Sequence, residues 1–430
     1  MSPVRFDEAT AQALAFLSAY AVSAKFTKLV AIRDLAGRYR FAIDGDTGAL
    51  ESALASIEPK MGAWLAESRS HKKHAYGRVL ARSQLFDAEQ VFESPDLVPI
   101  APKVFLLDRR VVAADWQRGQ IASTPSTPPR AVFFALKGGS GRSTALVYWV
   151  RHLAHDLGKR VLVVDLDLEA PGVSAALLPI GKRPRFGLVD WYVEDAVGQA
   201  DADLLDQMTM QSPIASGAAG CVFVAPVAGD SSDYLAKLAR VYAAPPGSGD
   251  LGSFGNRTAR LIEALEQHIQ PDVTVIDSRA GLHDVAAVSV VRLGATCFLF
   301  ASPTSECWLG YRYMFEAWGK RPEVVESFRE RLQTVAALVP EEGADAYVRR
   351  VREQAHDLFS EWIYDDESVE NPFNFNLDNE DGPHFPIEVL WNRRFFAHDP
   401  LSVAADRVIE ASIEVNFGAF LRRADALVLP

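Results

Sequence analysis

Short apolar runs constrain the fold of this 430-residue chain more than any other feature, and they dominate the part after residue 130. Six of these runs have the length and composition of β-strands, with helical stretches between several of them: residues 132–136, 161–165, 222–225, 273–276, 297–301 and 334–338. Strands that are apolar along their whole length are buried on both faces, as in a parallel sheet covered by helices. We therefore predict an α/β fold with a doubly wound, mostly parallel sheet.

A Ser/Thr/Pro-rich run at residues 122–129 separates this part from the rest, because its prolines block both helix continuation and strand pairing. Before it, residues 7–24 have a helical pattern and residues 104–107 resemble a strand. Residues 28–34 and 39–44 resemble two strands joined through Gly37. The expected organisation is a small N-terminal α+β domain (1–121), a linker (122–129) and a larger α/β domain (130–430).

Charge and cysteine content exclude several classes of protein. Residues 1–129 carry 16 basic and 14 acidic side chains, whereas residues 130–430 carry 28 basic and 42 acidic ones. A body this acidic repels polyphosphate, so we expect no non-specific binding of nucleic acid by the larger part. Three cysteines without C-x-x-C spacing disfavour a disulfide framework or a structural zinc site. No apolar segment is long enough for a membrane span, so we expect a cytoplasmic protein without membrane association.

The strongest local signal is the glycine-rich sequence KGGSGRST at residues 137–144, which lies between an apolar strand and a helical pattern over residues 143–157. Glycines allow backbone N–H groups to surround phosphate oxygens, and the positive end of the helix dipole faces the same place. The predicted phosphate-binding residues are Gly138, Gly139, Ser140, Gly141, Arg142, Ser143 and Thr144. A glycine-rich turn without a ligand is the alternative.

Acidic side chains end two other predicted strands. Asp165 ends the second predicted strand and Asp167 follows it, and Asp277 comes directly after the fourth. Carboxylates at the carboxyl ends of parallel strands can hold Mg²⁺ and orient an attacking water molecule in phosphoryl transfer. Arg279 follows Asp277 closely, and it is either a stabiliser of transition-state charge or a structural ion-pair partner.

The loop and the acidic strand ends together resemble the deviant P-loop ATPases of the ParA/MinD type. In that family the loop reads K-G-G-x-G-K-[ST]-T, so Lys137 matches the early signature lysine and Arg142 replaces the second one. With arginine at this position, the loop resembles that of a variant subgroup with the motif K-G-G-V-G-R. The resemblance implies a P-loop nucleotide-binding domain with ATP and Mg²⁺ as cofactors, and a homodimer in which Lys137 reaches the phosphates of the opposite protomer.

The same resemblance assigns roles to individual residues. It implies that Ser143, Asp165 and Asp277 hold the metal and that Asp167 positions the attacking water. It also implies that Thr144 lies near the α-phosphate and that Gly281 lies close to the γ-phosphate. Arg142 is expected to contact phosphate, and its larger planar head makes the rate of hydrolysis uncertain.

The predicted function is therefore an ATP-binding, slowly hydrolysing switch that acts through nucleotide-dependent dimerisation. One alternative is a nucleotide-gated binding or scaffold protein with little hydrolysis, within a multi-protein system such as defence or positioning. Another is a ligase or synthetase built on the same loop. The N-terminal domain is expected to recognise a protein partner that the sequence does not identify.

Three further segments have a structural interpretation. The basic stretch at residues 69–82 and the acidic stretch at residues 365–381 are expected to be a solvated helix face and a solvated loop, respectively. The apolar residues of the stretch 416–429 have helical spacing, and we expect them to dock onto the core of the protein rather than on a membrane.

Overall fold

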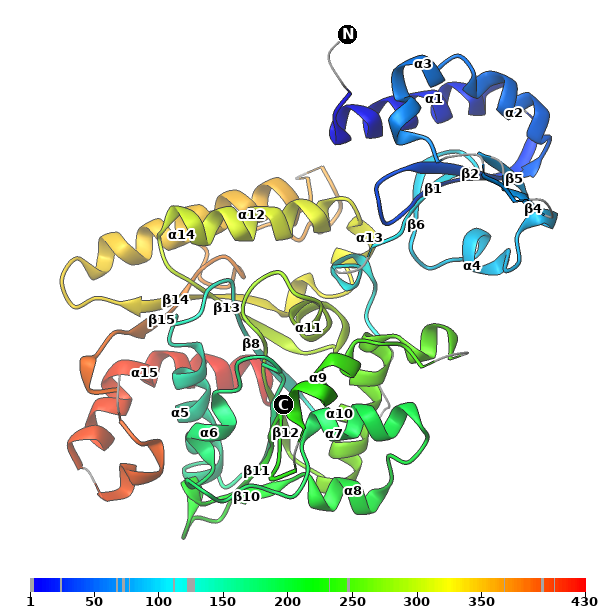
Figure 1. Ribbon diagram of the computed structural model, residues 1–430. Coiled ribbons are helices and arrows are strands. Elements are labelled where there is room, and N and C mark those ends of the chain that lie inside the picture. Colours follow the sequence, from blue (N-terminus) through cyan, green and yellow to red (C-terminus); the bar gives the residue numbers. More distant parts are fainter. Residues whose placement is uncertain are drawn as a thin grey trace. The chain divides into compact units, whose positions relative to one another are not determined.

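The computed structural model describes residues 4–430 except for 24, 67–68, 72–73, 77, 111–112, 122–127, 232, 246–247, 367, 396–397 and 406. The chain divides into two compact units, Met1–Ala114 and Asp115–Pro430 (Figure 1). The division lies a few residues before the predicted linker because Asp115 already belongs to the larger unit, where its carboxylate pairs with Arg292 at 2.5 Å. Most of the predicted linker lies outside the described residues.

The smaller unit is an α+β fold built on a five-stranded mixed sheet in the order β5-β2-β1-β7-β6. Its strands in this sheet are β1 (Phe26–Arg33), β2 (Tyr39–Gly45), β5 (Val79–Ala81), β6 (Leu97–Ala101) and β7 (Val104–Asp108). A separate hairpin consists of β3 (Arg69–His71) and β4 (His74–Tyr76). The helices are α1 (Phe6–Ser23), α2 (Thr47–Leu54), α3 (Glu58–Met61) and α4 (Glu89–Phe92).

The predicted hairpin of the smaller unit is confirmed. Strands β1 and β2 pair antiparallel, and Gly37 in the connecting turn has a φ of 82°, in the left-handed region that favours glycine. Residues 7–24 and 104–107 were predicted as a helix and a strand, and they correspond to α1 and β7.

The larger unit contains an eight-stranded sheet in the order β10-β11-β9-β12-β8-β13-β14-β15. Only β10 runs antiparallel to its neighbour, so the predicted mostly parallel sheet is confirmed. The strands are β8 (Arg130–Ala135), β9 (Arg160–Asp165), β10 (Met210–Ser212), β11 (Cys221–Ala225), β12 (Val273–Asp277), β13 (Thr296–Ala301), β14 (Leu332–Val339) and β15 (Ile387–Leu390).

Helices connect these strands and cover both faces of the sheet (Figure 1). They are α5 (Arg142–His155), α6 (Val173–Leu177), α7 (Leu188–Ala196), α8 (Ala202–Gln207), α9 (Tyr234–Val241), α10 (Phe254–Ile269), α11 (Asp284–Ala287), α12 (Ser305–Gly319), α13 (Pro322–Val325), α14 (Ala344–Trp362) and α15 (Arg407–Val428). Two adjacent residues of the central strand β8 show the two layers. The ring of Phe133 lies 5.8 Å from that of Trp149 in α5, whereas the ring of Phe134 lies 6.3 Å from that of Tyr311 in α12.

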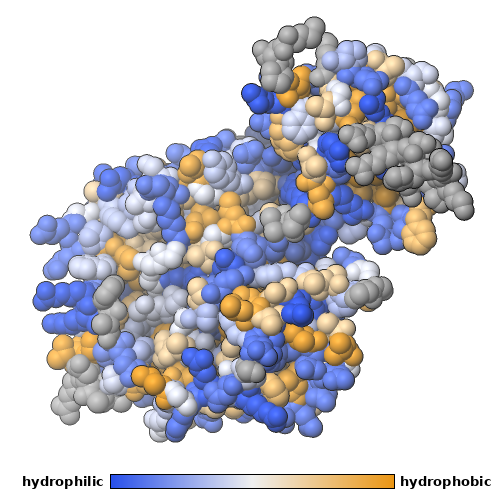
Figure 2. All heavy atoms as spheres, in the orientation of Figure 1, coloured by the Kyte–Doolittle hydropathy of each residue, from blue (hydrophilic) through white to orange (hydrophobic). Residues whose placement is uncertain are grey.

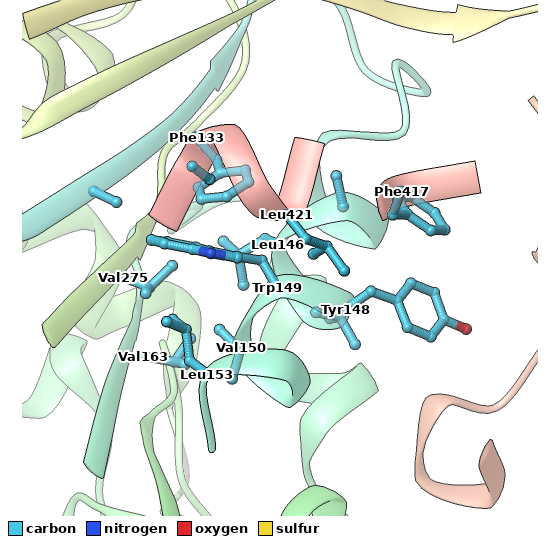
Figure 3. Close-up of a cluster of buried hydrophobic side chains, with 14 of the residues drawn as sticks. Phe133, Leu146, Tyr148, Trp149, Val150, Leu153, Val163, Val275, Phe417 and Leu421 are labelled. Atoms are coloured by element: carbon cyan, nitrogen blue, oxygen red, sulfur yellow. The ribbon is translucent and has the colours of Figure 1, made fainter. Parts of the chain in front are cut away.

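Helix α15 completes the core on the α5 face of the sheet. Figure 3 shows Trp149 and Leu146 of α5 between strand residues and the side chains of Phe417 and Leu421. Phe420 is fully buried, and its ring centroid lies 5.3 Å from that of Phe298 and 5.7 Å from that of Phe133. The predicted docking of residues 416–429 onto the protein's own core is thus confirmed.

The acidic stretch at residues 365–381 forms no helix or strand in its described part, as predicted. Asp366, Glu370 and Asp378 are exposed, but Asp365 is anchored by Arg329 at 2.6 Å. The predicted basic helix face at residues 69–82 is wrong as far as the structure describes it, since residues 69–71, 74–76 and 79–81 are strands. Most of its basic side chains lie outside the described residues.

No helix within the described ranges is long and apolar enough to cross a membrane. On the face of the molecule in Figure 2, apolar side chains occur in small groups among hydrophilic ones.

The packing of α15 leads to a stability prediction. Phe420→Ala removes a ring that is buried against three other aromatic rings, so we expect the free energy of unfolding to fall by about 3–5 kcal/mol. Urea unfolding of the full chain, followed by near-UV circular dichroism, measures the loss. Val415→Ala is the matched control on the same helix, because Val415 is 70% exposed and should change stability by less than about 0.5 kcal/mol. Equal effects of the two substitutions would contradict the docking.

Candidate functional site

The glycine-rich loop connects the central strand β8 to the first turn of α5. Gly139 and Gly141 have φ values of 76° and 75°, a left-handed conformation that other residues rarely adopt, and Gly141 is the N-cap of α5. A Cβ atom on Gly141 would lie 2.8 Å from Cδ2 of Leu338, so a side chain at this left-handed position would also force Leu338 to shift. Lys137, Gly138 and Gly139 are exposed and Ser140 is partly exposed, so the loop is open to a ligand.

Strand order brings the predicted acidic residues to the same edge of the sheet. Strand β12 lies between β8 and β9, and Asp277 is in register with Asp165 on one side and Phe133 on the other. All three strands are parallel, so their carboxyl ends meet where α5 begins. The predicted convergence of the loop with Asp165 and Asp277 is therefore present.

Asp277 is the centre of this arrangement and is 1% exposed. The hydroxyl of Ser143 donates a hydrogen bond to its Oδ2 at 2.9 Å. Nε of Arg142 lies 2.8 Å from its Oδ1, but neither of these two atoms has a hydrogen-bond partner of good geometry. Nη2 of Arg142 also lies 3.4 Å from Oδ2 of Asp167. The guanidinium thus bridges two carboxylates that come from different strand ends.

Asp165 is fully buried and makes different contacts. Its Oδ2 accepts hydrogen bonds from the backbone N–H of Ser174 at 3.1 Å and from the Ser174 hydroxyl at 2.7 Å. Its Oδ1 accepts a weaker hydrogen bond from the N–H of Asp167 at 3.3 Å. Ser174 is not among the residues predicted for the site, although the Pro-Gly pair at residues 171–172 indicates a turn directly before it.

Burial controls the ionisation of these carboxyl groups. It raises the pKa of Asp165 to about 7, with a further contribution from the charge of Asp277. Burial also raises the pKa of Asp277 to about 6, and the nearby Arg142 guanidinium opposes this effect. The pKa of Asp167 is raised by burial as well, again against the charge of Arg142. The single positive charge of Arg142 is therefore too small to neutralise all three carboxylates when they are ionised.

The other predicted residues surround this centre. Gly281 has a φ of 88°, and its N–H donates to the carbonyl of Ala135 at 3.1 Å, which holds the loop after β12 against the start of the glycine-rich loop. Lys137 is exposed. The pKa of Glu306 in α12 is lowered first by its own backbone N–H and then by the charge of Lys137, so this lysine lies near the start of α12.

Arg279 forms an ion pair in this structure. Its Nη1 lies 2.5 Å from Oε2 of Glu169, and the hydroxyl of Tyr242 donates to the other carboxylate oxygen of Glu169 at 2.5 Å. The contact joins the loop after β9 to the loop after β12. Of the two roles predicted for Arg279, the structural ion pair is therefore present.

A cavity of about 210 Å³ opens beside the glycine-rich loop. It is lined by Gly139, Gly141 and Thr144 and by residues of β14, β15 and α15 with their connections, among them Leu338, Trp391, Asn392 and Phe417. Trp391 is 54% exposed, so part of its indole faces the solvent. Sequence analysis did not find this cavity, because it depends on β15, a four-residue strand that was not predicted.

The residues present fit a magnesium ion that is bound together with a phosphate. Among the residues that the structure describes, no group of three or more His, Cys, Asp or Glu side chains can hold a metal ion by itself. Mg²⁺, however, is typically held by one or two carboxylates together with phosphate oxygens and water. The buried Oδ1 of Asp277, which lacks a hydrogen bond, and the neighbouring Ser143 hydroxyl are suitable ligands.

No family model and no curated protein sequence matches the chain. Solved structures do match. A ParA family ATPase from Chlorobium tepidum has 14% identity and a TM-score of 0.40, with 65% of this chain and 94% of that one covered. The pNOB8 ParA bound to nonspecific DNA has 17% identity and a TM-score of 0.41, with 70% and 99% covered. MinD from Pyrococcus horikoshii, complexed with Mg-ADP, has 18% identity and a TM-score of 0.33, with 50% and 72% covered.

These likenesses are distant, so we infer the function of this chain from the residues of its site. The lack of non-specific nucleic-acid binding stays a prediction.

The raised carboxyl pKa values predict a pH dependence of stability. An acid whose pKa is raised on folding holds its proton more tightly in the folded state, so its contribution to the free energy of unfolding falls as pH rises. For Asp165 this fall should extend from about pH 4 to about pH 7. Asp165→Asn cannot ionise, and we expect its thermal midpoint to fall less over this range than that of the wild type. Asp230→Asn, at an exposed position, should follow the wild type. If the thermal midpoints of all three proteins changed equally with pH, the raised pKa of Asp165 would be wrong.

Proposed function

We propose that the larger unit binds ATP with Mg²⁺ at the glycine-rich loop and acts as a nucleotide-dependent switch. The observation that carries this proposal is the contact of Arg142 and Ser143, the first two residues of α5, with the buried carboxylate of Asp277 at the end of the neighbouring strand. A phosphate at the loop would therefore lie between the helix N-terminus and acidic groups that can hold its metal ion.

The phosphate groups are proposed to bind the open backbone of the loop. The N–H groups of the segment from Gly138 to Thr144 supply hydrogen-bond donors, and the positive end of the α5 dipole adds to the attraction. Lys137 and Arg142 supply the positive charge. Gly281 is proposed to lie near the terminal phosphate, because the hydrogen bond from its N–H to the carbonyl of Ala135, the last residue of β8, holds it next to the loop.

The metal ion is proposed to bind to Ser143 and Asp277, with Asp165 behind them in register on β9. When bound, Mg²⁺ would neutralise phosphate charge and favour attack on the terminal phosphate. Asp167 is proposed to position the attacking water, because it is the most accessible of the three carboxylates and still belongs to the same cluster. Arg279 is held by Glu169 at the rim of the cluster, and it could act on phosphate only after leaving that ion pair.

The cavity beside Thr144 supports a nucleotide over inorganic phosphate as the ligand. It lies directly next to the loop, and an indole face is a good stacking surface for a base. We propose that the base lies against Trp391.

Dimerisation around the nucleotide is a further part of the proposal. Lys137 is exposed and has neither an ion pair nor a hydrogen bond within the part of the chain that the structure describes, so its ammonium is available to a second protomer. The smaller unit, with its own sheet and core, is proposed to recognise a protein partner.

The phosphate-binding role of the loop can be tested by calorimetry. Gly141→Ala adds a Cβ at a left-handed position and against Leu338, so we expect the affinity for Mg²⁺-ATP to fall at least about tenfold. Gly198→Ala is the matched control: it has a φ of 75° as well, but no atom within 4 Å of the added Cβ and no place in the loop. Its affinity should be unchanged. If the folded wild type takes up no ATP, the proposal is wrong.

Phosphate release at increasing protein concentration separates a hydrolysing switch from a binding protein. We expect the rate per molecule to rise with concentration in the wild type, because Lys137 would complete the site of another protomer. In Lys137→Ala the rate should be low and independent of concentration, and Asp167→Ala should release phosphate only at background level while it still binds ATP. Background release by the wild type, with ATP bound, would instead support the nucleotide-gated binding protein.

A further inference from the structure

The guanidinium of Arg142 lies among the carboxylates to which a metal ion would bind. It is 8% exposed, 2.8 Å from Asp277 and 3.4 Å from Asp167. The other arginine near these strand ends, Arg279, is paired with Glu169 instead. Arg142 is therefore the buried cation in contact with both Asp167 and Asp277, and it offsets part of their charge.

A divalent cation on Asp277 would have to approach this guanidinium closely. Both contacts of Arg142 with Asp277 and Asp167 are made inside the protein, where water screens charge poorly. Like charges at such a distance repel strongly, and Asp277 Oδ1, the oxygen nearest to Arg142, is also the one without a hydrogen bond. A metal ion would thus have to compete with the guanidinium for the same oxygen.

We propose that Arg142 is the resident cation of the Asp167 and Asp277 carboxylates, and that a divalent cation can bind to Asp277 only after the guanidinium has moved away. A phosphate group is a strong bidentate partner for arginine, and the glycine-rich loop would hold such a group next to Arg142. The movement of Arg142 onto a phosphate rests on the proposed function. The metal would then enter together with the nucleotide and not before it.

The contact geometry of Arg142 agrees with such a movement. Its Nε lies close to Asp277 Oδ1 without a hydrogen bond of good geometry, and its contact with Asp167 is long. Buried charges that are paired but poorly hydrogen-bonded gain little from the pairing. Such a guanidinium can be displaced by a ligand that offers better-aligned oxygens.

The experiment measures metal binding to the nucleotide-free full chain, with Mn²⁺ as a spectroscopic probe for Mg²⁺. We expect negligible Mn²⁺ binding by the wild type. In Arg142→Gln the carboxylates lose their resident cation, so Mn²⁺ should bind at least about tenfold more tightly, and Mg²⁺ alone should raise the thermal midpoint. Arg142→Lys, which keeps the positive charge but replaces the planar fork with a compact ammonium on a flexible stem, should lie between the two.

Arg279→Gln is the matched control, because it removes a positive charge that acts on Asp167 from the neighbouring loop but is ion-paired with Glu169 and not with Asp277. It should leave Mn²⁺ binding as weak as in the wild type. Tight Mn²⁺ binding by the nucleotide-free wild type would overturn the proposal, and this result does not require any variant to fold. A folded Arg142→Gln protein without increased affinity would also overturn it, and so would an equal gain in Arg279→Gln.

The affinity for ATP, measured once in EDTA and once with Mg²⁺, tests the proposed function independently of this proposal. A folded wild type that fails to bind ATP with or without Mg²⁺ contradicts the nucleotide switch. The competition between Arg142 and the metal is decided by the nucleotide-free measurements alone.

Discussion

The carboxylate of Asp277 is the group on which the rest of the site depends. It ends a strand in the middle of the sheet, and it receives both the Ser143 hydroxyl and the Arg142 guanidinium from the first turn of α5. Because burial removes water from Asp277, its charge has to be balanced by protein groups or by a ligand. The positions of the glycine-rich loop and of α5 are thus coupled to the charge state of one strand end.

Much of this arrangement could be predicted from the sequence, because it follows from local patterns. The glycines at 139 and 141 fix a left-handed loop, and the apolar strands place Asp165 and Asp277 at one edge of a parallel sheet. The contacts of Arg142 could not be predicted. A residue at a helix start can point its side chain at a ligand or at the protein, and the choice depends on strand order, which brings Asp277 next to the loop.

Other parts of the site depend on segments that are distant in sequence. Trp391 lines the same cavity as Thr144 because β15 joins the sheet next to β14, after the long acidic stretch at residues 365–381. A strand of four residues has little pattern of its own, so neither β15 nor the cavity could be predicted from the sequence. Ser174 is similar: its hydrogen bonds to Asp165 arise from the way α6 packs.

The structure also gives a physical reason for an arginine at position 142. A planar guanidinium presents N–H groups along its length and reaches Asp167 and Asp277 at once, whereas a compact ammonium is a point charge that would need the two carboxylates to come closer together. The same bridge has a cost for ligand binding. A triphosphate that binds Arg142 must separate the guanidinium from two carboxylates, and this separation lowers the net binding free energy. A metal ion that takes the place of the guanidinium would offset this loss. We therefore expect the metal ion and the triphosphate to bind to the loop together, and the free energy needed to displace Arg142 to limit their affinity.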